Sequence, residues 1–187
     1  MLHGGAQPAR LERIMARRAT ARPTTTPPVL HGPSYSTYTR SVRLALAEKG
    51  VDYRLEALDM LGGAHHNEAF LALSPFGKVP VLVHGEAVIY ETAAINRYVD
   101  EAFDGPSLQP DDPLARARMG QIRGVIDAYA YKTLVGEIVM QRVVFPKLGR
   151  RTNPQVVRRA VPAMRQSLLA LEALAADGDW LAGKKLS

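Results

Sequence analysis

The residues that could carry chemistry in this chain are polar groups at the points where predicted loops meet predicted helices or strands. In chain order they are Ser36, His65, His66, Lys78, Val79, Pro80, Glu91 and Thr92. Such junctions can converge on one edge of a sheet that contains parallel strands, because the handedness of the connections is fixed. Together they would offer hydroxyls, an imidazole, an ammonium group, a backbone pair and a helix N-terminus. This set suits an extended peptide that carries carboxylates.

Thr92 is the best placed of these residues for binding an anion. Four apolar residues recur after it with helical spacing, so Thr92 stands at or near a helix N-terminus: Ile95, Tyr98, Val99 and Ala102. Free backbone N–H groups and the helix dipole favour an anion there. Two interpretations stay open at this point. Thr92 binds a carboxylate of a peptide ligand, or it only caps its own helix.

Several other chemistries have no support in the sequence. The chain has no cysteine, so it has no protein thiolate to act as nucleophile, redox centre or zinc ligand. No glycine-rich phosphate-binding motif, GxSxG nucleophile motif or HExxH zinc motif occurs. Of the five histidines only His65 and His66 are adjacent, and adjacent side chains on a helix or strand diverge. We therefore expect no metal site.

Much of the positive charge belongs to the N-terminus. The net charge of the 187 residues is +6, and residues 1–28 contribute five arginines and one glutamate, which leaves +2 for the other 159 residues. This distribution argues against a nucleic-acid partner. No apolar run approaches the roughly 20 residues that span a bilayer, so no membrane partner is expected either.

Residues 1–28 are predicted to be a disordered extension. They are either an organelle transit peptide or, as we favour, an extension without function or one that precedes a start at Met15.

A small set of elements must position the candidate residues. Residues 29–103 are predicted to form a domain of order βαβαββα, with a mixed sheet whose first two strands are parallel. The predicted elements are a strand over Val29–His31, a helix from Thr37 or Tyr38 to Lys49, a strand over Tyr53–Leu58, a helix over Glu68–Leu73 capped by Asn67, and strands over Val81–Val83 and Ala87–Tyr90. The last two strands form a hairpin across His84-Gly85-Glu86.

The rest of the chain, after a linker over residues 104–112, is predicted to be helical. Asp112-Pro113 and Asn153-Pro154 each combine a capping residue with a proline suited to the first helical turn. We expect one helix from Pro113 to about Arg142, followed by a break over residues 145–149.

A second helix is expected to begin at Pro154, to kink at Pro162 and to stop at Asp177-Gly178. Its apolar face is predicted to contain Val157, Val161, Met164, Leu168 and Leu171.

The chain resembles the soluble glutathione S-transferase family in three stretches, which are SYSTYTRSVRLALAEKG, GGAHHNEAFLALSPFGKVPVL and IYETAAINRYVDE. Each stretch is a weak signal alone, but together they cover nearly all of that family's N-terminal domain. The serine-type phi class and its bacterial relatives are the most similar. The resemblance implies an α/β thioredoxin-like, glutathione-binding domain over residues 29–103 and an incomplete all-α domain over residues 113–187.

The resemblance implies a catalytic role for Ser36, with glutathione as co-substrate. Its hydroxyl would hydrogen-bond the glutathione sulfur. A donor and a helix N-terminus lower the pKa of a thiol from its usual value of about 8.5, so more of it is thiolate at neutral pH. Ser34, Thr37 and Tyr38 are nearby hydroxyls that could take this role instead.

The same resemblance implies how the rest of glutathione is held. Pro80 would follow a cis peptide bond that turns the backbone of Val79 towards the cysteinyl backbone of the ligand. Lys78 and one of the two adjacent histidines would meet the glycine carboxylate. Glu91 and Thr92 would hold the γ-glutamyl end. The family more often has serine at the position of Thr92, and phi members often have lysine at the position of the second histidine.

The chain is predicted to be C-terminally truncated relative to this family. The segment Asp179–Gly183 resembles the lead into the family's central buried helix, and the chain ends at Ser187, which matches the serine that caps that helix. Losing about five buried apolar side chains would remove on the order of 10 kcal/mol, which rivals the stability of a whole domain. We expect either a fragment of a longer product or a poorly packed helical half.

The activity implied is that of a cytoplasmic, homodimeric glutathione transferase of the detoxification type, which attacks a hydrophobic electrophile. The electrophile would lie in an apolar cleft between the domains lined by Tyr38, Ile126 and Tyr129, although core packing is the more ordinary use of Ile126. The alternative is a non-catalytic glutathione-binding or interaction module, or an inactive truncated fragment. The lack of cysteine disfavours thiol–disulfide chemistry, while glutathione peroxidase activity stays open.

Overall fold

The computed structural model describes residues 26–175 and 180–182. The predicted extension lies almost entirely outside the described residues, and so do the predicted helix stop at Asp177-Gly178 and most of the segment from Asp179 to Ser187. The chain divides into two compact units between Pro106 and Ser107, a point inside the segment expected to be a linker. We call the first the α/β unit and the second the helical unit.

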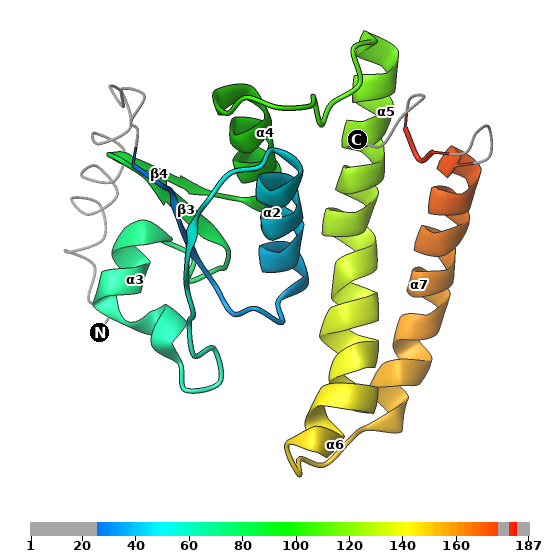
Figure 1. The fold of residues 1–187 in the computed structure, drawn as a ribbon. Helices are drawn as coiled ribbons and strands as arrows, with labels where there is room; N and C mark the ends of the chain where they lie inside the picture. Colours follow the sequence, from blue (N-terminus) through cyan, green and yellow to red (C-terminus); the bar gives the residue numbers. More distant parts are fainter. Residues whose placement is uncertain (1–25, 176–179, 183–187) are drawn as a thin grey trace, which may run out of the picture. The chain divides into compact units, whose positions relative to one another are not determined.

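The α/β unit is built on a four-stranded mixed sheet (Figure 1). Its strands are β1 (Val29–His31), β2 (Arg54–Glu56), β3 (Val81–His84) and β4 (Ala87–Tyr90). Their order in the sheet is β2-β1-β3-β4. β1 pairs in parallel with β2 and antiparallel with β3, and β3 pairs antiparallel with β4. The predicted mixed sheet with a parallel first pair is confirmed.

Two strand boundaries differ from the prediction. β2 is three residues long instead of spanning Tyr53–Leu58, because its neighbour β1 is also three residues long and offers no further ladder. The hairpin turn contains two residues, Gly85-Glu86, because His84 still pairs with Ala87. Gly85 has a φ of 59°, the left-handed conformation that a two-residue hairpin turn requires.

Three helices cover the sheet: α2 (Thr37–Glu48), α3 (Glu68–Leu73) and α4 (Thr92–Ala102). α2 and α4 pack together on one side of it, and α3 lies on the other (Figure 1). Asn67 caps α3 as predicted, since its side-chain oxygen accepts from the backbone N–H of Phe70 at 2.7 Å. The fully buried side chains of this core include Leu30, Val42, Leu46, Leu82, Ile95 and Val99.

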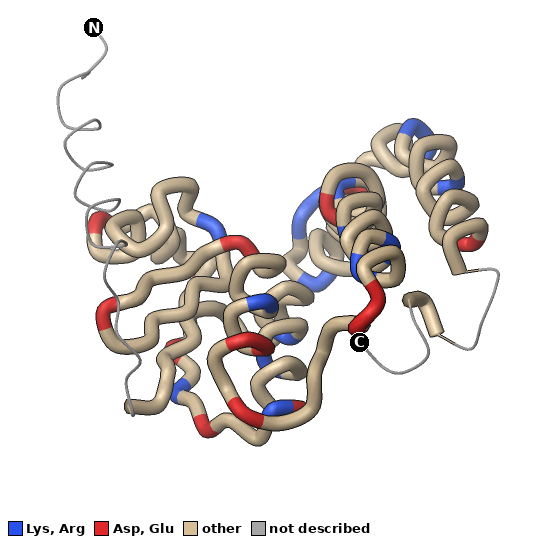
Figure 2. The backbone as a smooth tube through the Cα atoms, turned by 90° about the horizontal axis from the view of Figure 1, so that it is seen from above, with Lys and Arg blue, Asp and Glu red and all other residues tan. Residues whose placement is uncertain are grey.

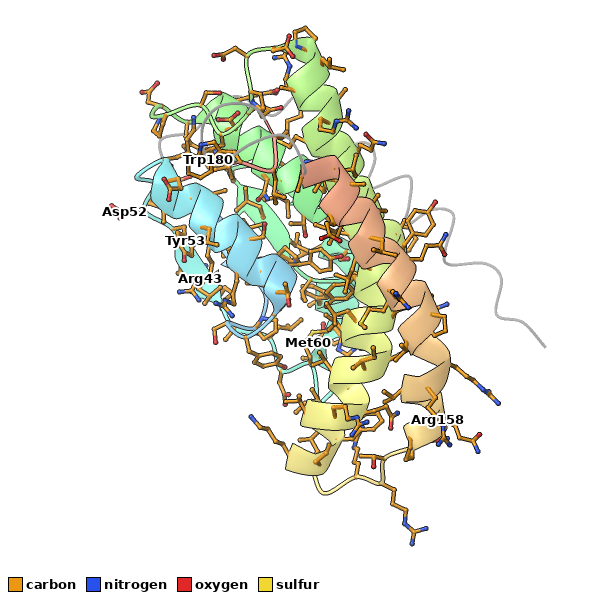
Figure 3. The ribbon with its side chains drawn as sticks, turned by 90° about the vertical axis from the view of Figure 1, so that its right-hand side faces the viewer. Arg43, Asp52, Tyr53, Met60, Arg158 and Trp180 are labelled. Atoms are coloured by element: carbon orange, nitrogen blue, oxygen red, sulfur yellow. The ribbon has the colours of Figure 1, made fainter. Side chains whose placement is uncertain are left out.

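A buried ion pair ties α2 and α4 to the last residues of the α/β unit. Nζ of Lys49, the C-cap residue after α2, lies 3.1 Å from Oδ1 of Asp100 on α4, and both side chains are almost fully buried. The same ammonium group donates to the carbonyl of Pro106 at 3.0 Å. In a half-buried position, Arg43 of α2 donates to the hydroxyl of Tyr53 at 2.9 Å, which joins α2 to the segment before β2 (Figure 3). These contacts attach to α2 both the segment before β2 and the last residues of the α/β unit.

The helical unit begins with a long helical rod rather than the shorter helix predicted. α5 (Pro113–Val125) continues through two π-helical segments, η2 (Ile126–Ala130) and η3 (Lys132–Val144), into α6 (Phe145–Lys147). The expected break over residues 145–149 is therefore wrong for its first half. Pro146 sits at the start of α6, and the chain turns only at Gly149, which has a φ of 65°.

α7 (Pro154–Ala175) forms the second helix, as predicted, and contains Pro162, where the expected kink stays a prediction. Asn153 caps it, with Oδ1 accepting from the N–H of Gln155 at 3.0 Å. The predicted apolar face is partly wrong, because Val161 and Leu168 are 43% and 47% exposed. Val157 is buried as predicted, and the other buried residues of α7 are Ala160 and Ser167. Ser167 is tolerated there because its hydroxyl donates back to the carbonyl of Ala163 within the helix.

No helix in the described part of the chain combines the length and the apolar character needed to cross a membrane.

Candidate active site

The register of the sheet brings three of the predicted site segments to one end of it. His31, the last residue of β1, pairs with Val81, the first residue of β3. Val81 pairs in turn with Tyr90, the last residue of β4. The segments after His31, before Val81 and after Tyr90 therefore leave the sheet side by side. These segments carry Ser36, Val79, Pro80, Glu91 and Thr92.

Ser36 is the N-cap of α2, one position from where the predicted helix was to begin. Its Oγ accepts a hydrogen bond from the backbone N–H of Thr39 at 3.4 Å, and the residue is half-buried. This bond uses a lone pair of the hydroxyl and leaves its hydrogen free to donate to a ligand. The site therefore combines a hydroxyl donor with the positive end of a helix dipole.

A tight contact fixes the loop that carries Ser36. Thr39 is fully buried, and a Cβ added to Gly32 would lie 2.4 Å from its Oγ1. The chain after β1 thus packs directly on the first turn of α2, where only a glycine fits. Sequence reasoning missed this pair, although a glycine directly after a strand was a visible signal.

The loop that contains the two histidines packs against the turn before Lys78. Residues Ala64–His66 form a single 3₁₀ turn, η1, and a Cβ on Gly77 would lie 2.8 Å from the carbonyl oxygen of His65. The rings of His65 and His66 lie 3.8 Å apart, tilted by 44°. The expectation that these adjacent side chains diverge is wrong, because the pair lies in neither a strand nor a regular α-helix.

Three basic groups share this loop region. Burial lowers the pKa of His65 below its ordinary value of 6.5, and the charges of His66 and Lys78 lower it further. Positive neighbours disfavour an additional positive charge, so the site is electropositive before any ligand binds. Nδ1 of His65 is buried and has no hydrogen-bond partner among the described residues. Lys78 and the two histidines therefore lie close enough to influence one another, and their joint binding of a carboxylate stays a prediction.

Gly77 is expected to be essential for this arrangement. The substitution Gly77→Ala adds a Cβ against a backbone oxygen and strains a residue whose φ is 59°. We expect a loss of about 1–3 kcal/mol of unfolding free energy, together with weaker binding of carboxylate ligands, because the loop must move away from Lys78. Chemical denaturation and ligand titration measure the two effects.

The matched control for Gly77→Ala is Gly63→Ala. Gly63 lies in the same loop, has a φ of 80° and leaves open space around an added Cβ. This variant should show how much unfolding free energy is lost when alanine replaces glycine at a positive φ without a steric clash. Equal effects of the two substitutions on ligand binding would contradict the importance of the contact with His65.

The predicted cis peptide bond is present between Val79 and Pro80. Pro80 is buried and Val79 is half-buried. Since β3 begins at Val81, the backbone of Val79 lies outside the strand ladder. An extended ligand could therefore use the N–H and C=O of Val79.

Glu91 adopts a conformation that nothing in the sequence signals. Its φ is 69° and its ψ is 114°, and among the described residues it is the only non-glycine residue with a positive φ. Such a backbone costs about 1–3 kcal/mol and is concentrated at ligand sites. Glu91 occupies the N-cap position of α4 without a side-chain cap bond, and Thr92 is the first residue of the helix. The interpretation of Thr92 as a simple cap is therefore wrong, and the first turn of α4 has no side-chain cap.

The residues expected to contact the second substrate lie in different units. Tyr38 is half-buried on α2. In the helical unit, Ile126 and Tyr129 are 37% and 66% exposed, so neither is a core residue, and the buried neighbour is Ile122 at 6%. The cleft lined by these three residues stays a prediction. No group of three or more potential metal ligands is gathered within residues 26–175 and 180–182.

Comparison with known proteins supplies the family. Residues 35–102 match the model of the glutathione S-transferase N-terminal domain. Glutathione S-transferase 3 of Zea mays is 32% identical over 160 residues, which are 84% of this chain and 71% of the relative. The solved structure of glutathione S-transferase III in its apo form superposes with a TM-score of 0.73 at 33% identity, covering 87% of this chain and 75% of that one. Glutathione S-transferase-I bound with lactoylglutathione gives a TM-score of 0.72 at 27% identity, over 87% and 77% of the two chains. The described fold and these matches agree, and the chain belongs to the glutathione S-transferase family.

Proposed function

We propose that this chain transfers glutathione to a hydrophobic electrophile and that Ser36 activates the thiol. The observation that carries the proposal is the position of the Ser36 hydroxyl, which caps α2 and keeps its hydrogen free to donate. A thiolate accepts such a hydrogen bond better than a thiol does, and the dipole of α2 favours the negative charge. As in its family, glutathione is the co-substrate. The thiolate sulfur then bonds to the electrophilic carbon, and the leaving group departs with its electron pair.

The other binding roles that we propose are those that the family resemblance implies. Lys78 and His65 or His66 bind the glycine carboxylate, supported by the electropositive character of their shared loop region. The backbone of Val79 pairs with the cysteinyl residue of glutathione, next to the buried Pro80. The uncapped first turn of α4, with Thr92 and the strained Glu91, binds the γ-glutamyl carboxylate.

The test is conjugation of 1-chloro-2,4-dinitrobenzene by the purified full chain. Saturable, protein-dependent formation of the conjugate supports the proposal. Binding to immobilised glutathione without any conjugation would instead identify a glutathione-binding module.

We further propose that the chain acts as a cytoplasmic homodimer, for which membership of the family is the support.

The pKa of His65 provides a second prediction. Because that pKa lies below 6.5 in the free protein, His65 is mostly neutral at pH 7, whereas a bound carboxylate favours the imidazolium. Binding of S-methylglutathione, which has no thiol to ionise, should therefore take up protons, and its affinity should rise as the pH falls from 7.5 towards 5.5. Isothermal titration calorimetry in two buffers of different ionisation enthalpy measures this uptake.

The control for proton uptake is His65→Gln, which removes the titrating group and keeps a hydrogen-bonding side chain. It should abolish most of the uptake. His66→Gln separates the second histidine, since either residue of the pair could meet the carboxylate. Proton uptake that is unchanged in both variants would contradict a histidine contact.

A further inference from the structure

The helical unit carries a long stretch of the chain with positive charge only. Between Glu137 and Glu172 there is no acidic residue, while seven residues are basic: Arg142, Lys147, Arg150, Arg151, Arg158, Arg159 and Arg165. All seven are exposed. None of them has an ion-pair partner among the described residues. The net charge of the whole chain does not reveal this positive stretch, because residues 26–112 carry twelve acidic and six basic residues, whose negative net charge offsets it.

Six of the seven residues gather around one turn. Lys147, Arg150 and Arg151 lie at or next to the turn that joins α6 to α7, and Arg142 precedes it in η3. Arg158 and its neighbour Arg159 lie in the first two turns of α7, where Figure 3 shows the side chain of Arg158 beside the joining turn. Basic positions continue along α7 in Figure 2. We call residues 142–159 the basic end of the helical unit.

The basic end is held in a defined shape. The N–H of Arg150 donates to the carbonyl of Phe145 at 2.8 Å, and the guanidinium of Arg150 lies 6.0 Å from the centre of the Phe145 ring. The N–H of Asn153 donates to Oε1 of Gln141 at 2.6 Å, which ties the start of α7 to η3. The like charges are therefore kept together by structure, although they repel one another.

Exposed apolar side chains lie among these charges. Val143 and Leu148 are 44% and 40% exposed, and each directly follows a basic residue. Val161, 43% exposed, follows in α7. Nucleic acid would match the charges but would gain little from these apolar groups. The surface of an anionic bilayer offers phosphates to the basic residues and an apolar layer beneath them.

We propose that the basic end binds the surface of a membrane rich in anionic phospholipid. This contact is peripheral and differs from spanning the bilayer, and it is independent of the glutathione site. The expectation of no membrane partner rested on the absence of a bilayer-spanning apolar run and on a net positive charge located mostly at the N-terminus. It did not take into account the local charge of residues 142–159.

The experiment measures binding of the full chain to vesicles by flotation. Vesicles of phosphatidylcholine with about 30% phosphatidylserine are compared with vesicles of phosphatidylcholine alone. The test variant is Lys147→Gln/Arg151→Gln/Arg158→Gln, and its control is Arg116→Gln/Arg118→Gln/Lys132→Gln, which removes the same kinds of charge from exposed positions elsewhere in the rod. Near a charged bilayer each basic residue is worth about fivefold in affinity, so the test variant should bind on the order of 100-fold more weakly and the control within about threefold.

Two further measurements separate the alternatives. Leu148→Ser should weaken binding to the anionic vesicles, and circular dichroism confirms that each variant is folded. Equal binding to both kinds of vesicle, or equal losses in the test and control variants, would overturn the proposal. So would tight binding of duplex DNA together with no binding to vesicles, which would assign the basic end to nucleic acid.

Discussion

Replacing Ser36 with alanine is expected to lower kcat/KM for conjugation of 1-chloro-2,4-dinitrobenzene by about 10- to 100-fold, since a hydrogen bond to a charged acceptor contributes about 1.5–3 kcal/mol. The substitution removes a hydrogen bond to the thiolate form of glutathione and leaves the contacts to the glutathione backbone in place. The pKa of bound glutathione should therefore rise by about one to two units. A pH titration of thiolate absorbance in the binary complex measures this shift directly, and the affinity for S-methylglutathione should change little.

Ser36→Ala also removes a helix cap, which alone costs about 1 kcal/mol of unfolding free energy. Asp112→Ala is the matched control, because Oδ2 of Asp112 caps α5 through the N–H of Ala115 at 2.7 Å, outside the proposed glutathione site. It should reduce stability to a similar degree while kcat/KM stays within twofold. If Ser36→Ala itself stays within twofold, the activating hydroxyl is not Ser36. The variants Ser34→Ala and Thr37→Ala would then be measured next.

Lys49→Met is expected to remove about 3–5 kcal/mol of unfolding free energy from the α/β unit, because it leaves a buried carboxylate without its ammonium partner. The Asp100 side chain is only 6% exposed, and the carbonyl of Pro106 loses a donor in the same step. Such a loss is a large part of the stability of a typical domain. Denaturant unfolding monitored by circular dichroism gives the value.

Two variants show whether the effect of Lys49→Met comes from burial of a charge. Arg97→Met breaks an exposed ion pair with Glu101 on the same helix as Asp100, and it should cost about 0.5 kcal/mol or less. Lys49→Met/Asp100→Leu removes both buried charges and should recover much of the stability lost in the single variant. A double variant as unstable as Lys49→Met would argue that packing, and not the charge, dominates.

The parts of the fold that sequence reasoning predicted well are those set by local chemistry. Asn67 and Asp112 each precede a helix and each accepts the backbone hydrogen bond expected of a cap. Ser36, expected only in the loop before its helix, accepts the same kind of bond. The hairpin follows from two short apolar runs on either side of Gly85. The positions of the candidate site residues follow from the same local signals, because they stand where one element ends and the next begins, while their binding roles stay a prediction.

The features that were missed depend on contacts between distant parts of the chain or on unusual backbone. The length of β2 is limited by β1, and the buried face of α7 includes Ser167, whose hydroxyl bonds within its own helix. The positive φ of Glu91 has no signal in the sequence, because glutamate rarely adopts such a backbone conformation. The π-helical continuation of α5 likewise has no recognisable composition.

The row formed by His31, Val81 and Tyr90 has a consequence for how the site comes into being. His31 and Val81 are 50 positions apart in the sequence, yet they are direct neighbours across the sheet. Closing a loop of that length is entropically unfavourable until the strands around it pair. No early, local folding event can therefore assemble the binding site. The proposed binding site therefore depends on the long-range pairing of β1 with β3 and forms only together with the sheet.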